Sequence, residues 1–349
     1  MQQNRHGIRL THVLHNVYLE SIGYELPPYV VSSEALVEQL ESTSQRLSID
    51  AGSVLQATGV EERRFWAPGA TIVETATRAA RKAIEASELD PDLIGCVVNT
   101  SVCKDYLEPS MASLIHGELG LKPECLNLDL GNACLGFLNG ITFVADLIEF
   151  GRIKAGIVVD AESSREVVEK TIERLSRPET DAESFRLNLA TLTLGSGAVA
   201  VVLTHGDVGK KQHRIKGHVS LADTVHRNLC LGTPQQMLVH AQELLKAGLM
   251  LARQTWGMGQ KLMGWNSGSL DFIVGHQVGS RHFKKLFEMF GLDQSRTFVT
   301  YPFLGNVGPA SIPLTLALAV ERGLIRPGYR LALMGIGSGL NCLMMEIEW

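Results

Sequence analysis

Hydrophobic residues along the chain form short continuous runs, which alternate with longer stretches in which they recur at helical spacing. The short runs are rich in β-branched residues, as is typical of strands buried on both faces of a sheet. We predict such strands at residues 94–99, 155–160, 198–203, 270–275 and 330–334. The longer stretches predict helices at residues 72–87, 135–149, 165–174 and 312–321. Alternation of strands with helices indicates an α/β fold.

One strand–turn–helix–turn–strand pattern occurs twice in the sequence. Leu130-Gly-Asn-Ala-Cys134 and Leu304-Gly-Asn-Val-Gly308 each precede a nearly apolar helix, and glycine-bounded turns follow at residues 151–156 and 323–328. A single short gap aligns both copies, so we predict two related α/β halves, residues 1–204 and 205–349, around a pseudo-twofold axis. Residues 163–195 have no counterpart in the second half, which indicates a partly helical insert.

The two copies differ at the positions that could carry chemistry. Cys134 in the first copy stands where the second has Gly308, and His276 stands where the first has Thr100, while Asn306 lies in the second turn. Loops at the carboxyl ends of strands are where α/β folds bind ligands. We therefore predict a shared site on the axis, with Cys134, His276 and Asn306 as its reactive residues.

Cys134 is a candidate nucleophile because it lies just before a predicted helix. The positive end of a helix dipole favours the thiolate form, and a neighbouring imidazole would favour it further. The simpler alternative is a cysteine that only packs, as we expect for Cys96, Cys103, Cys125, Cys230 and Cys342. Asn306 could likewise serve only as a turn residue. The Gly335–Gly339 stretch could be a tight turn or a set of backbone donors for an oxyanion.

Composition and charge restrict the class of protein. The chain has 349 residues, of which 45% are hydrophobic, which excludes a disordered protein. The net charge of −5 argues against nucleic-acid binding. Residues 1–6 are mixed polar and do not form the apolar core of a signal peptide. No apolar run is long enough to span a bilayer. No two cysteines have the CxxC spacing that would indicate a metal site. We expect a cytoplasmic protein without a metal or redox cofactor.

The order cysteine, histidine, asparagine also occurs in papain-like proteases, but Asn132-Ala-Cys-Leu-Gly-Phe137 lacks their signature, so a protease is rejected. The motifs instead resemble those of the thiolase superfamily and its ketoacyl synthase III branch. Cys134 lies in the family's Gly-Asn-Ala-Cys-Leu-Gly-Phe context, His276 in Gly-His-Gln, and Asn306 in Gly-Asn-Val-Gly-Pro-Ala-Ser. The resemblance implies a layered αβαβα fold, an acyl-cysteine intermediate and a homodimer.

Within that superfamily the chain resembles the OleA-type enzymes that condense two acyl-CoA molecules head to head. The resemblance is carried by residues 99–102, 104–110, 169–174, 192–195 and 335–342. It implies a non-decarboxylative Claisen condensation of two long-chain acyl-CoAs to a 2-alkyl-3-ketoacyl product, the first step of long-chain olefin biosynthesis. Downstream enzymes of that pathway are possible partners. Two alternatives remain, a decarboxylative 3-oxoacyl-[acyl-carrier-protein] synthase III and a non-catalytic acyl-binding subunit.

The resemblance also assigns roles to single residues. Glu108 would act in the partner subunit's site as the base that removes the α-proton, while His276 and Asn306 would hydrogen-bond the enolate oxygen. Backbone N–H groups of Cys134 and Ser338 would stabilise the tetrahedral intermediates. Coenzyme A thioesters are then substrates, and no cofactor is implied. The Met- and Trp-rich residues 244–265 could line an acyl channel or form a buried amphipathic helix.

Overall fold

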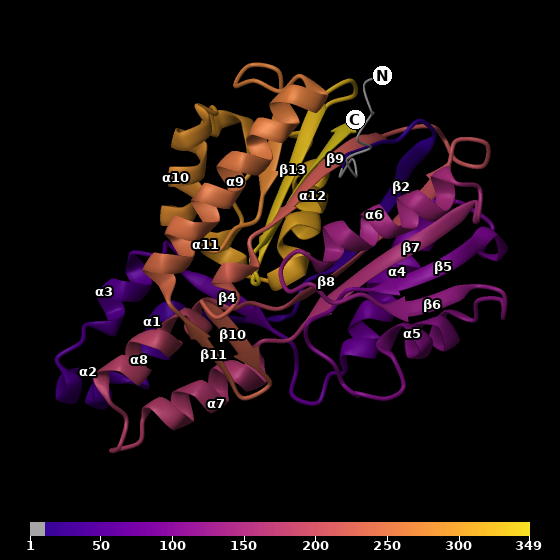
Figure 1. Ribbon diagram of the computed structural model, residues 1–349. Coiled ribbons are helices and arrows are strands. Elements are labelled where there is room, and N and C mark those ends of the chain that lie inside the picture. The colour runs from indigo at the N-terminus through magenta and orange to yellow at the C-terminus, as the bar shows by residue number, and fades with distance from the viewer. Residues whose placement is uncertain (1–10) are drawn as a thin grey trace.

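The computed structural model describes residues 11–349, and a ten-stranded sheet runs through its centre (Figure 1). The strands follow one another in the order β12-β13-β14-β9-β2-β8-β7-β5-β6, and β1 pairs with β9. Their bounds are Thr11–Val13 (β1), Val17–Glu25 (β2), Ile94–Asn99 (β5), Leu126–Asp129 (β6), Ala155–Glu162 (β7), Gly197–His205 (β8), Arg214–Ala222 (β9), Phe272–Gly275 (β12), Arg330–Gly337 (β13) and Asn341–Glu348 (β14).

The sheet consists of two parts with the same topology. A single residue pair, Tyr18 with Arg214, joins β2 to β9, so the sheet is weakly connected there. On one side β5 runs parallel to β6 and β7, and β8 lies antiparallel between β7 and β2. On the other side β12 runs parallel to β13, and β14 lies antiparallel between β13 and β9, while Thr297 bridges to Ile273 in parallel beside β12. Strands β5 and β12 therefore occupy equivalent places.

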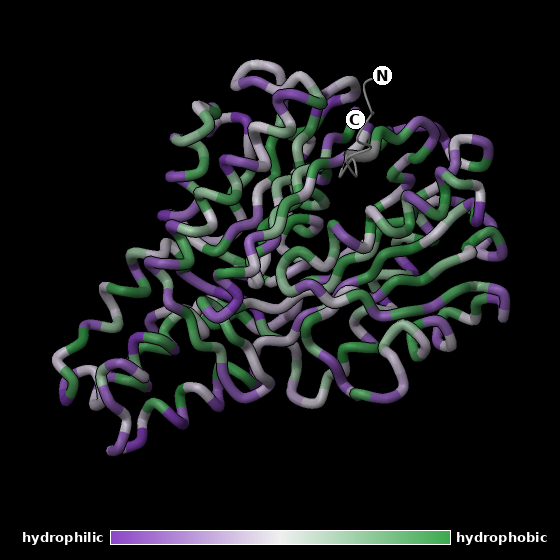
Figure 2. Tube along the Cα trace, viewed as in Figure 1, coloured by the Kyte–Doolittle hydropathy of each residue, from purple (hydrophilic) through white to green (hydrophobic). Residues whose placement is uncertain are grey.

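Helices cover both outer faces of the sheet and fill the space between its two parts (Figure 1). The outer helices are α4 (Ile72–Ser87) and α5 (Met111–Leu119) on the first part, and α9 (Ala241–Met263) and α10 (Ser280–Phe290) on the second. Between them lie α6 (Gly136–Glu149) and α12 (Ser311–Glu321), whose apolar side chains share one core with strands of both parts. This arrangement is the predicted αβαβα layering. Hydrophobic residues accordingly concentrate on these inner elements (Figure 2).

A smaller lobe lies beside the layers, at the lower left of Figure 1. It contains α1 (Ser33–Glu38), α2 (Glu41–Leu47), α3 (Ala51–Gln56), α7 (Arg165–Leu175), α8 (Ala182–Asn188), the hairpin β10 (Cys230–Thr233) with β11 (Gln236–Val239), and the pair β3 (Tyr29–Ser32) with β4 (Glu62–Phe65). The fully buried Arg63 ties it together by donating to the Val31 carbonyl, the Ser33 hydroxyl and the Leu192 carbonyl at 3.1, 2.9 and 2.7 Å. The predicted insert at 163–195 belongs to this lobe.

Short elements complete the fold and connect the strands to the site. They are α11 (Tyr301–Leu304) and the 3₁₀ turns Pro91–Leu93 (η1), Leu189–Thr193 (η2), Thr224–His226 (η3), Gln294–Arg296 (η4) and Gly308–Ala310 (η5). Helix α4 begins where predicted because Thr71 and Glu74 form a capping box, with the Thr71 hydroxyl accepting the Glu74 N–H at 3.2 Å. Local sequence thus sets the boundary of this helix.

The predicted α/β class and all nine predicted elements are confirmed, with differences at their ends. Strand 94–99 and helix 72–87 have the predicted bounds, whereas β7 continues to Glu162 because Ala161 and Glu162 remain paired with β8. The predicted strand at 270–275 begins only at Phe272. Within residues 11–349 no helix is long and apolar enough to span a membrane. The prediction made for residues 1–6 lies outside the described residues.

Candidate active site

Cys134 lies in a tight turn between β6 and α6. Ala133 adopts a left-handed backbone, with φ of 45°. The Leu135 N–H donates to the Asn132 carbonyl and the Gly136 N–H to the Ala133 carbonyl, each at 3.0 Å. Two N–H groups at the start of α6 are therefore already bonded within the turn, which leaves fewer of them to interact with the thiol.

The structure corrects the expectation that Cys134 is poised as a thiolate. Burial, together with the smaller effects of the neighbouring Cys230 and Glu162, raises the pKa of the Cys134 thiol to about 12. An apolar, partly acidic environment disfavours a thiolate, and this effect exceeds that of the helix terminus. Free Cys134 is therefore a thiol at neutral pH. Cys230, which we predicted to be only structural, contributes to the electrostatics of the site.

The turn around Cys134 is seated on the last strands of the chain. The Asn341 amide donates to the Asn132 side-chain oxygen at 3.1 Å, and the Asn132 amide donates to Asn139 on α6 at 2.8 Å. A Cβ atom at Gly337 would lie 3.0 Å from the Asn132 carbonyl oxygen and 3.1 Å from the Leu135 nitrogen. The glycine-rich stretch thus permits a close approach of β13 to the cysteine turn.

His276 follows β12 and has no hydrogen bond to either ring nitrogen. Its backbone N–H donates to the Met334 carbonyl at 2.8 Å, which holds it against β13. Both ring nitrogens are buried without a partner among the described residues. Burial, together with the positive charge that His282 can carry, lowers the pKa of His276 to about 4. The imidazole is therefore neutral at pH 7 and free to bind a substrate atom.

Asn306 is fixed in its turn by three hydrogen bonds. Its N–H donates to the Thr193 carbonyl at 2.8 Å, its carbonyl accepts from Gly195 at 2.9 Å, and its side-chain oxygen accepts the Gly308 N–H at 3.0 Å. The turn is therefore rigid, and it is attached to the end of the insert through Thr193 and Gly195.

Gln277 connects the histidine to the segment that leads to Asn306. Its side-chain oxygen accepts the N–H groups of Thr300 and Tyr301 at 2.7 and 3.1 Å, and its amide donates to the Phe298 carbonyl at 2.8 Å. Since Gln277 is the neighbour of His276, this buried residue fixes the histidine loop against α11. The sequence gives no local signal for this role, because the partners of Gln277 lie more than 20 residues away along the chain.

Two buried acidic residues at the end of β7 were also missed. Asp160 accepts a hydrogen bond from the Thr100 hydroxyl at 2.7 Å, and Glu162 accepts the N–H groups of Val102 and Cys103 at 2.6 and 3.3 Å. Burial raises the pKa of Glu162 to about 7 and raises the pKa of Asp160 well above its usual value. The available signal was a pair of carboxylates two residues apart at the end of an apolar strand.

Glu108, predicted to be a base, is exposed to solvent in its own chain. It lies in the loop at residues 101–110, where the neighbouring Leu107 is 97% exposed. The loop is nevertheless anchored, because Asp105 accepts the N–H groups of Ile72 and Val73 at 2.8 and 2.9 Å. Ser338 is partly exposed in the turn between β13 and β14. The contacts given above hold the Cys134 turn and His276 against β13 and the Asn306 turn against the end of the insert, whereas Glu108 is exposed on its own chain.

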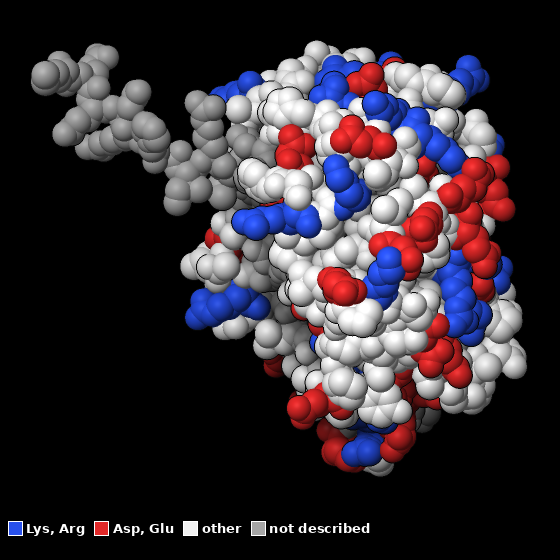
Figure 3. All heavy atoms as spheres, turned by 90° about the vertical axis from the view of Figure 1, so that its right-hand side faces the viewer, with Lys and Arg blue, Asp and Glu red and all other residues white. Residues whose placement is uncertain are grey.

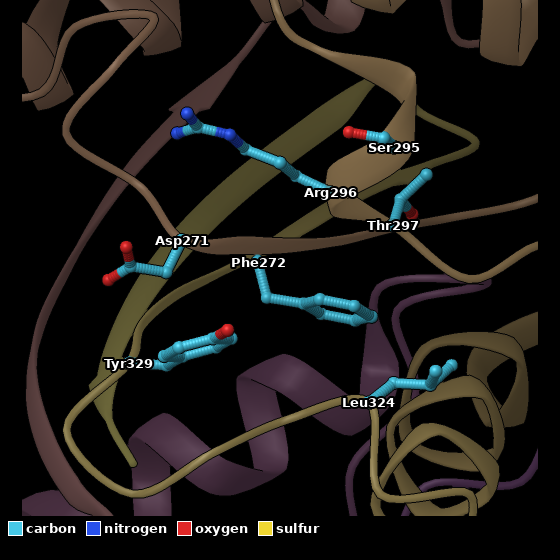
Figure 4. Close-up of a pocket in the computed structure, with 7 residues that line it drawn as sticks. All are labelled: Asp271, Phe272, Ser295, Arg296, Thr297, Leu324 and Tyr329. Carbon is cyan, nitrogen blue, oxygen red and sulfur yellow. The ribbon is translucent and has the colours of Figure 1, made fainter.

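A surface cavity of about 360 Å³ lies elsewhere (Figure 4). Its lining residues are Asp271, Phe272, Ser295, Arg296, Thr297, Leu324 and Tyr329. Phe272 begins β12 and His276 follows its end, so the two are separated along the strand by about 13 Å. The Arg296 guanidinium is already bonded to the Leu270 carbonyl at 2.8 Å. This cavity is therefore not part of the site around Cys134.

Neither the charges on the face shown in Figure 3 nor the potential metal ligands of residues 11–349 indicate a nucleic-acid site or a metal site. Lysine and arginine are interspersed with acidic residues over the face shown in Figure 3, which has no extended basic patch. Among residues 11–349 there is no group of three histidine, cysteine or acidic side chains that could hold a metal ion.

Comparison with known proteins identifies the family. Residues 261–349 match the model of the 3-oxoacyl-[acyl-carrier-protein] synthase III C-terminal domain. The chain is 38% identical over 334 residues to the acyl-CoA:acyl-CoA alkyltransferase of Xanthomonas campestris pv. campestris, covering 96% of this chain and 99% of that protein. It belongs to the acyl-CoA:acyl-CoA alkyltransferase family. The alkyltransferase of Shewanella oneidensis is 39% identical over 345 residues, covering 95% of this chain and 99% of that protein.

Solved structures of the alkyltransferase family have the same fold. A cysteine-to-serine variant of OleA from Xanthomonas campestris, with bound lauric acid and lauroyl-CoA, is 37% identical and matches with a TM-score of 0.94. The match covers 97% of this chain and 100% of that chain. Other structures of the same OleA carry substitutions of one histidine and of one glutamate.

Proposed function

We propose that this protein, an acyltransferase, joins two long-chain acyl-CoAs by a non-decarboxylative Claisen condensation. The product would be a 2-alkyl-3-ketoacyl compound, formed in the first step of long-chain olefin biosynthesis in the cytoplasm. The observation that carries the proposal is near-full-length similarity to acyl-CoA:acyl-CoA alkyltransferases, together with a seated cysteine turn and an unpartnered neutral imidazole. The chemistry needs coenzyme A thioesters as substrates and no further cofactor.

In the first half-reaction Cys134 would attack the thioester carbonyl of one acyl-CoA. Sulfur forms a bond to the acyl carbon, coenzyme A leaves, and the proton of the thiol is transferred to the departing thiolate. Because the pKa of the Cys134 thiol is raised to about 12, its proton must move to the departing thiolate as the sulfur attacks, and His276, whose two buried ring nitrogens have no partner among the described residues, would relay it. N–H groups of Cys134 and Ser338 would bind the oxyanion.

In the second half-reaction a base would remove the α-proton of the second acyl-CoA. The resulting carbanion attacks the acyl-cysteine, a carbon–carbon bond forms, and the Cys134 thiolate leaves. The side chains of His276 and Asn306 would hydrogen-bond the enolate oxygen. A carboxylate is a weak base in water, but desolvation raises its proton affinity, so Glu108 must become buried to act.

We propose that dimerisation buries Glu108. Strand β6 lies at one end of the sheet, and its first residue, Leu126, is 48% exposed. Val102, Tyr106 and Leu107 are further exposed apolar residues on the loop at 101–110. Pairing of two copies along β6 would extend the sheet and cover this loop, so that Glu108 reaches the active site of the second copy.

Spacing along the chain supports these residue assignments. The glutamate, the cysteine and the histidine altered in the OleA structures have the same separations along their chain as Glu108, Cys134 and His276 have here. Equal spacing is expected if the three residues are equivalent in the two proteins. We also propose that the matching strand orders reflect two duplicated halves, residues 1–204 and 205–349.

The test is mass spectrometry of products formed from myristoyl-CoA alone. We expect the wild type to form the condensed product and Glu108→Ala to lose it while still forming an acyl-cysteine. An unchanged rate of product formation in Glu108→Ala would remove the proposed base. Glu85→Ala, which removes an exposed carboxylate from the outer helix α4, is the matched control and should retain activity.

The match of residues 261–349 to the synthase III model favours one second candidate, decarboxylative condensation with malonyl-acyl carrier protein. That reaction releases CO₂ and needs no base, because decarboxylation generates the carbanion. Product and CO₂ that appear only when malonyl donor is added would therefore favour it. Failure of Cys134 to form any acyl-enzyme would instead indicate a non-catalytic acyl-binding subunit.

A further inference from the structure

The buried carboxylate of Glu162 occupies a special place in the duplicated fold. In the first part Asn99 is paired with Val159, and in the second the equivalent Gly275 is paired with Met334. Glu162 therefore stands where the second part has Gly337. The first part thus has a glutamate, only 6% exposed, at the position equivalent to Gly337, the glycine against which the Cys134 turn packs.

The turn that faces Glu162 is adapted to it. Gly308, the counterpart of Cys134, has no side chain, and a Cβ atom there would lie 3.8 Å from the carboxyl carbon of Glu162. In the other half Gly337 meets the Asn132 carbonyl and Leu135. Each strand end thus packs on the turn of the other half, and Glu162 is beside the turn that holds Asn306.

The carboxylate of Glu162 is bonded to the first residues of the loop at 101–110. One oxygen accepts the Val102 N–H at 2.6 Å and the other accepts the Cys103 N–H at 3.3 Å. At the other end of the loop Asp129 accepts the N–H groups of Met111 and Ala112 at 3.2 and 2.9 Å. Carboxylates therefore hold both ends of the segment that carries Glu108.

We propose that Glu162 is a positioning residue for the condensation step, because it fixes the loop that delivers Glu108 to the active site of a second copy. This inference rests on the proposed function. A glutamine could not replace Glu162, because its side chain has only one acceptor oxygen. Its NH₂ group, which is itself a donor, would lie opposite one of the two backbone N–H donors and could not accept its hydrogen bond. The loop would shift while Cys134 keeps its own turn.

The first experiment separates the two half-reactions in Glu162→Gln. We expect acylation of Cys134, followed by intact mass with one acyl-CoA, not to slow, because loss of the Glu162 charge favours the thiolate of Cys134, whereas the condensation rate falls at least about tenfold. Glu166→Gln, an exposed glutamate of α7, is the matched control and should change neither rate. Equal losses in both half-reactions would contradict the proposal. If Glu162→Gln does not fold, Glu162→Asp is the second variant. It retains the charge but moves the carboxylate away from the N–H groups of Val102 and Cys103, so condensation should again slow while acylation does not.

The second experiment uses mixed dimers, assembled with two affinity tags. A dimer of a Cys134→Ala subunit and a Glu108→Ala subunit has one intact Cys134 and one intact Glu108, on different chains. Adding Glu162→Gln to the chain that keeps Glu108 should lower the condensation rate at least about tenfold, whereas adding it to the Glu108→Ala chain should not lower the rate by more than about twofold. The opposite pattern would show that Glu162 acts on the cysteine of its own chain and would overturn the proposal.

The parent mixed dimer separates this inference from the proposed function. If the wild type condenses acyl-CoA but the parent mixed dimer does not, Glu108 is not delivered across the interface and the role of Glu162 fails with it. If the wild type itself forms no product from acyl-CoA alone, the proposed function fails. The positioning role is supported if the wild type and the parent mixed dimer both form product, and if product formation falls only when Glu162→Gln is on the chain that keeps Glu108.

Discussion

The side-chain amide of Asn341 donates a hydrogen bond to the side-chain oxygen of Asn132 at 3.1 Å, and this bond links the two halves at the cysteine turn. Asn132 in turn donates to Asn139 at 2.8 Å. The residue that shapes the nucleophile's turn is therefore held from two sides, by the last strand of the chain and by the helix that follows Cys134.

Loss of this link should destabilise the protein and loosen the turn. Asn341→Ala removes one hydrogen bond and is expected to lower the free energy of unfolding by about 1 kcal/mol, whereas Asn132→Ala removes two and should cost about 2 kcal/mol. Urea denaturation measures both. Acylation of Cys134 should slow more in Asn132→Ala, and equal effects of the two substitutions would contradict a bridging role for Asn132.

Close packing of β13 against the cysteine turn predicts the effect of a single methyl group. In Gly337→Ala the new Cβ would meet the Asn132 carbonyl oxygen at 3.0 Å, so the turn must move, and we expect acylation to fall about tenfold or more. Gly131→Ala is the control, because nothing lies within 4 Å of its added Cβ. Stopped-flow release of coenzyme A measures acylation, and equal rates in the two variants would argue against this packing.

The raised pKa of Cys134 predicts an unusual pH dependence of alkylation. With the pKa of the thiol raised to about 12, the thiolate fraction should increase about tenfold per pH unit throughout the range from pH 6 to 9. Intact mass after timed reaction with iodoacetamide gives the rate, and Cys134→Ala identifies the modified site. A plateau near neutral pH would show that the helix terminus or His276 stabilises the thiolate after all.

His213 should contribute to acid sensitivity. Its ring stacks on Trp349 with centroids 3.6 Å apart, and burial lowers the pKa of His213 from 6.5 to about 4. Between those pH values the unfolded chain binds a proton that the folded chain does not, so the free energy of unfolding falls as pH falls through this window.

The matching variant is His213→Phe, which preserves an aromatic ring but cannot be protonated. Its loss of stability between pH 7 and pH 4.5 should be smaller than that of the wild type, by on the order of 1 kcal/mol because the histidine is only partly buried. Urea midpoints at both pH values provide the measurement. An identical pH response in the two proteins would show that His213 titrates normally.

Local patterns in the sequence were sufficient for most of the fold. Helix α4 could be placed to the residue because its capping box and its alanine stripe lie within the sequence of the helix itself. The repeated Gly-Asn turns led to the prediction of Cys134, Asn306 and His276, since a duplication would conserve its turns and show where its two copies diverge. These features depend on neighbours along the chain.

Other properties of the site depend on contacts between distant segments. The pKa of Cys134 could not be inferred from its position before a helix, because burial by both halves opposes the dipole of that helix. Gln277 and Glu162 were overlooked because their partners are backbone N–H groups of remote loops. Such donors leave no mark in the local sequence.

The sequence by itself determined the elements, and it predicted a duplication and the types of reactive residue, because periodicity, turn chemistry and repeated motifs are local. Only the tertiary structure decided which carboxylates are buried, which glycines permit close approach and which protonation state the cysteine holds. Those properties arise from desolvation and from hydrogen bonds between segments far apart along the chain, and they form only when the two halves pack together.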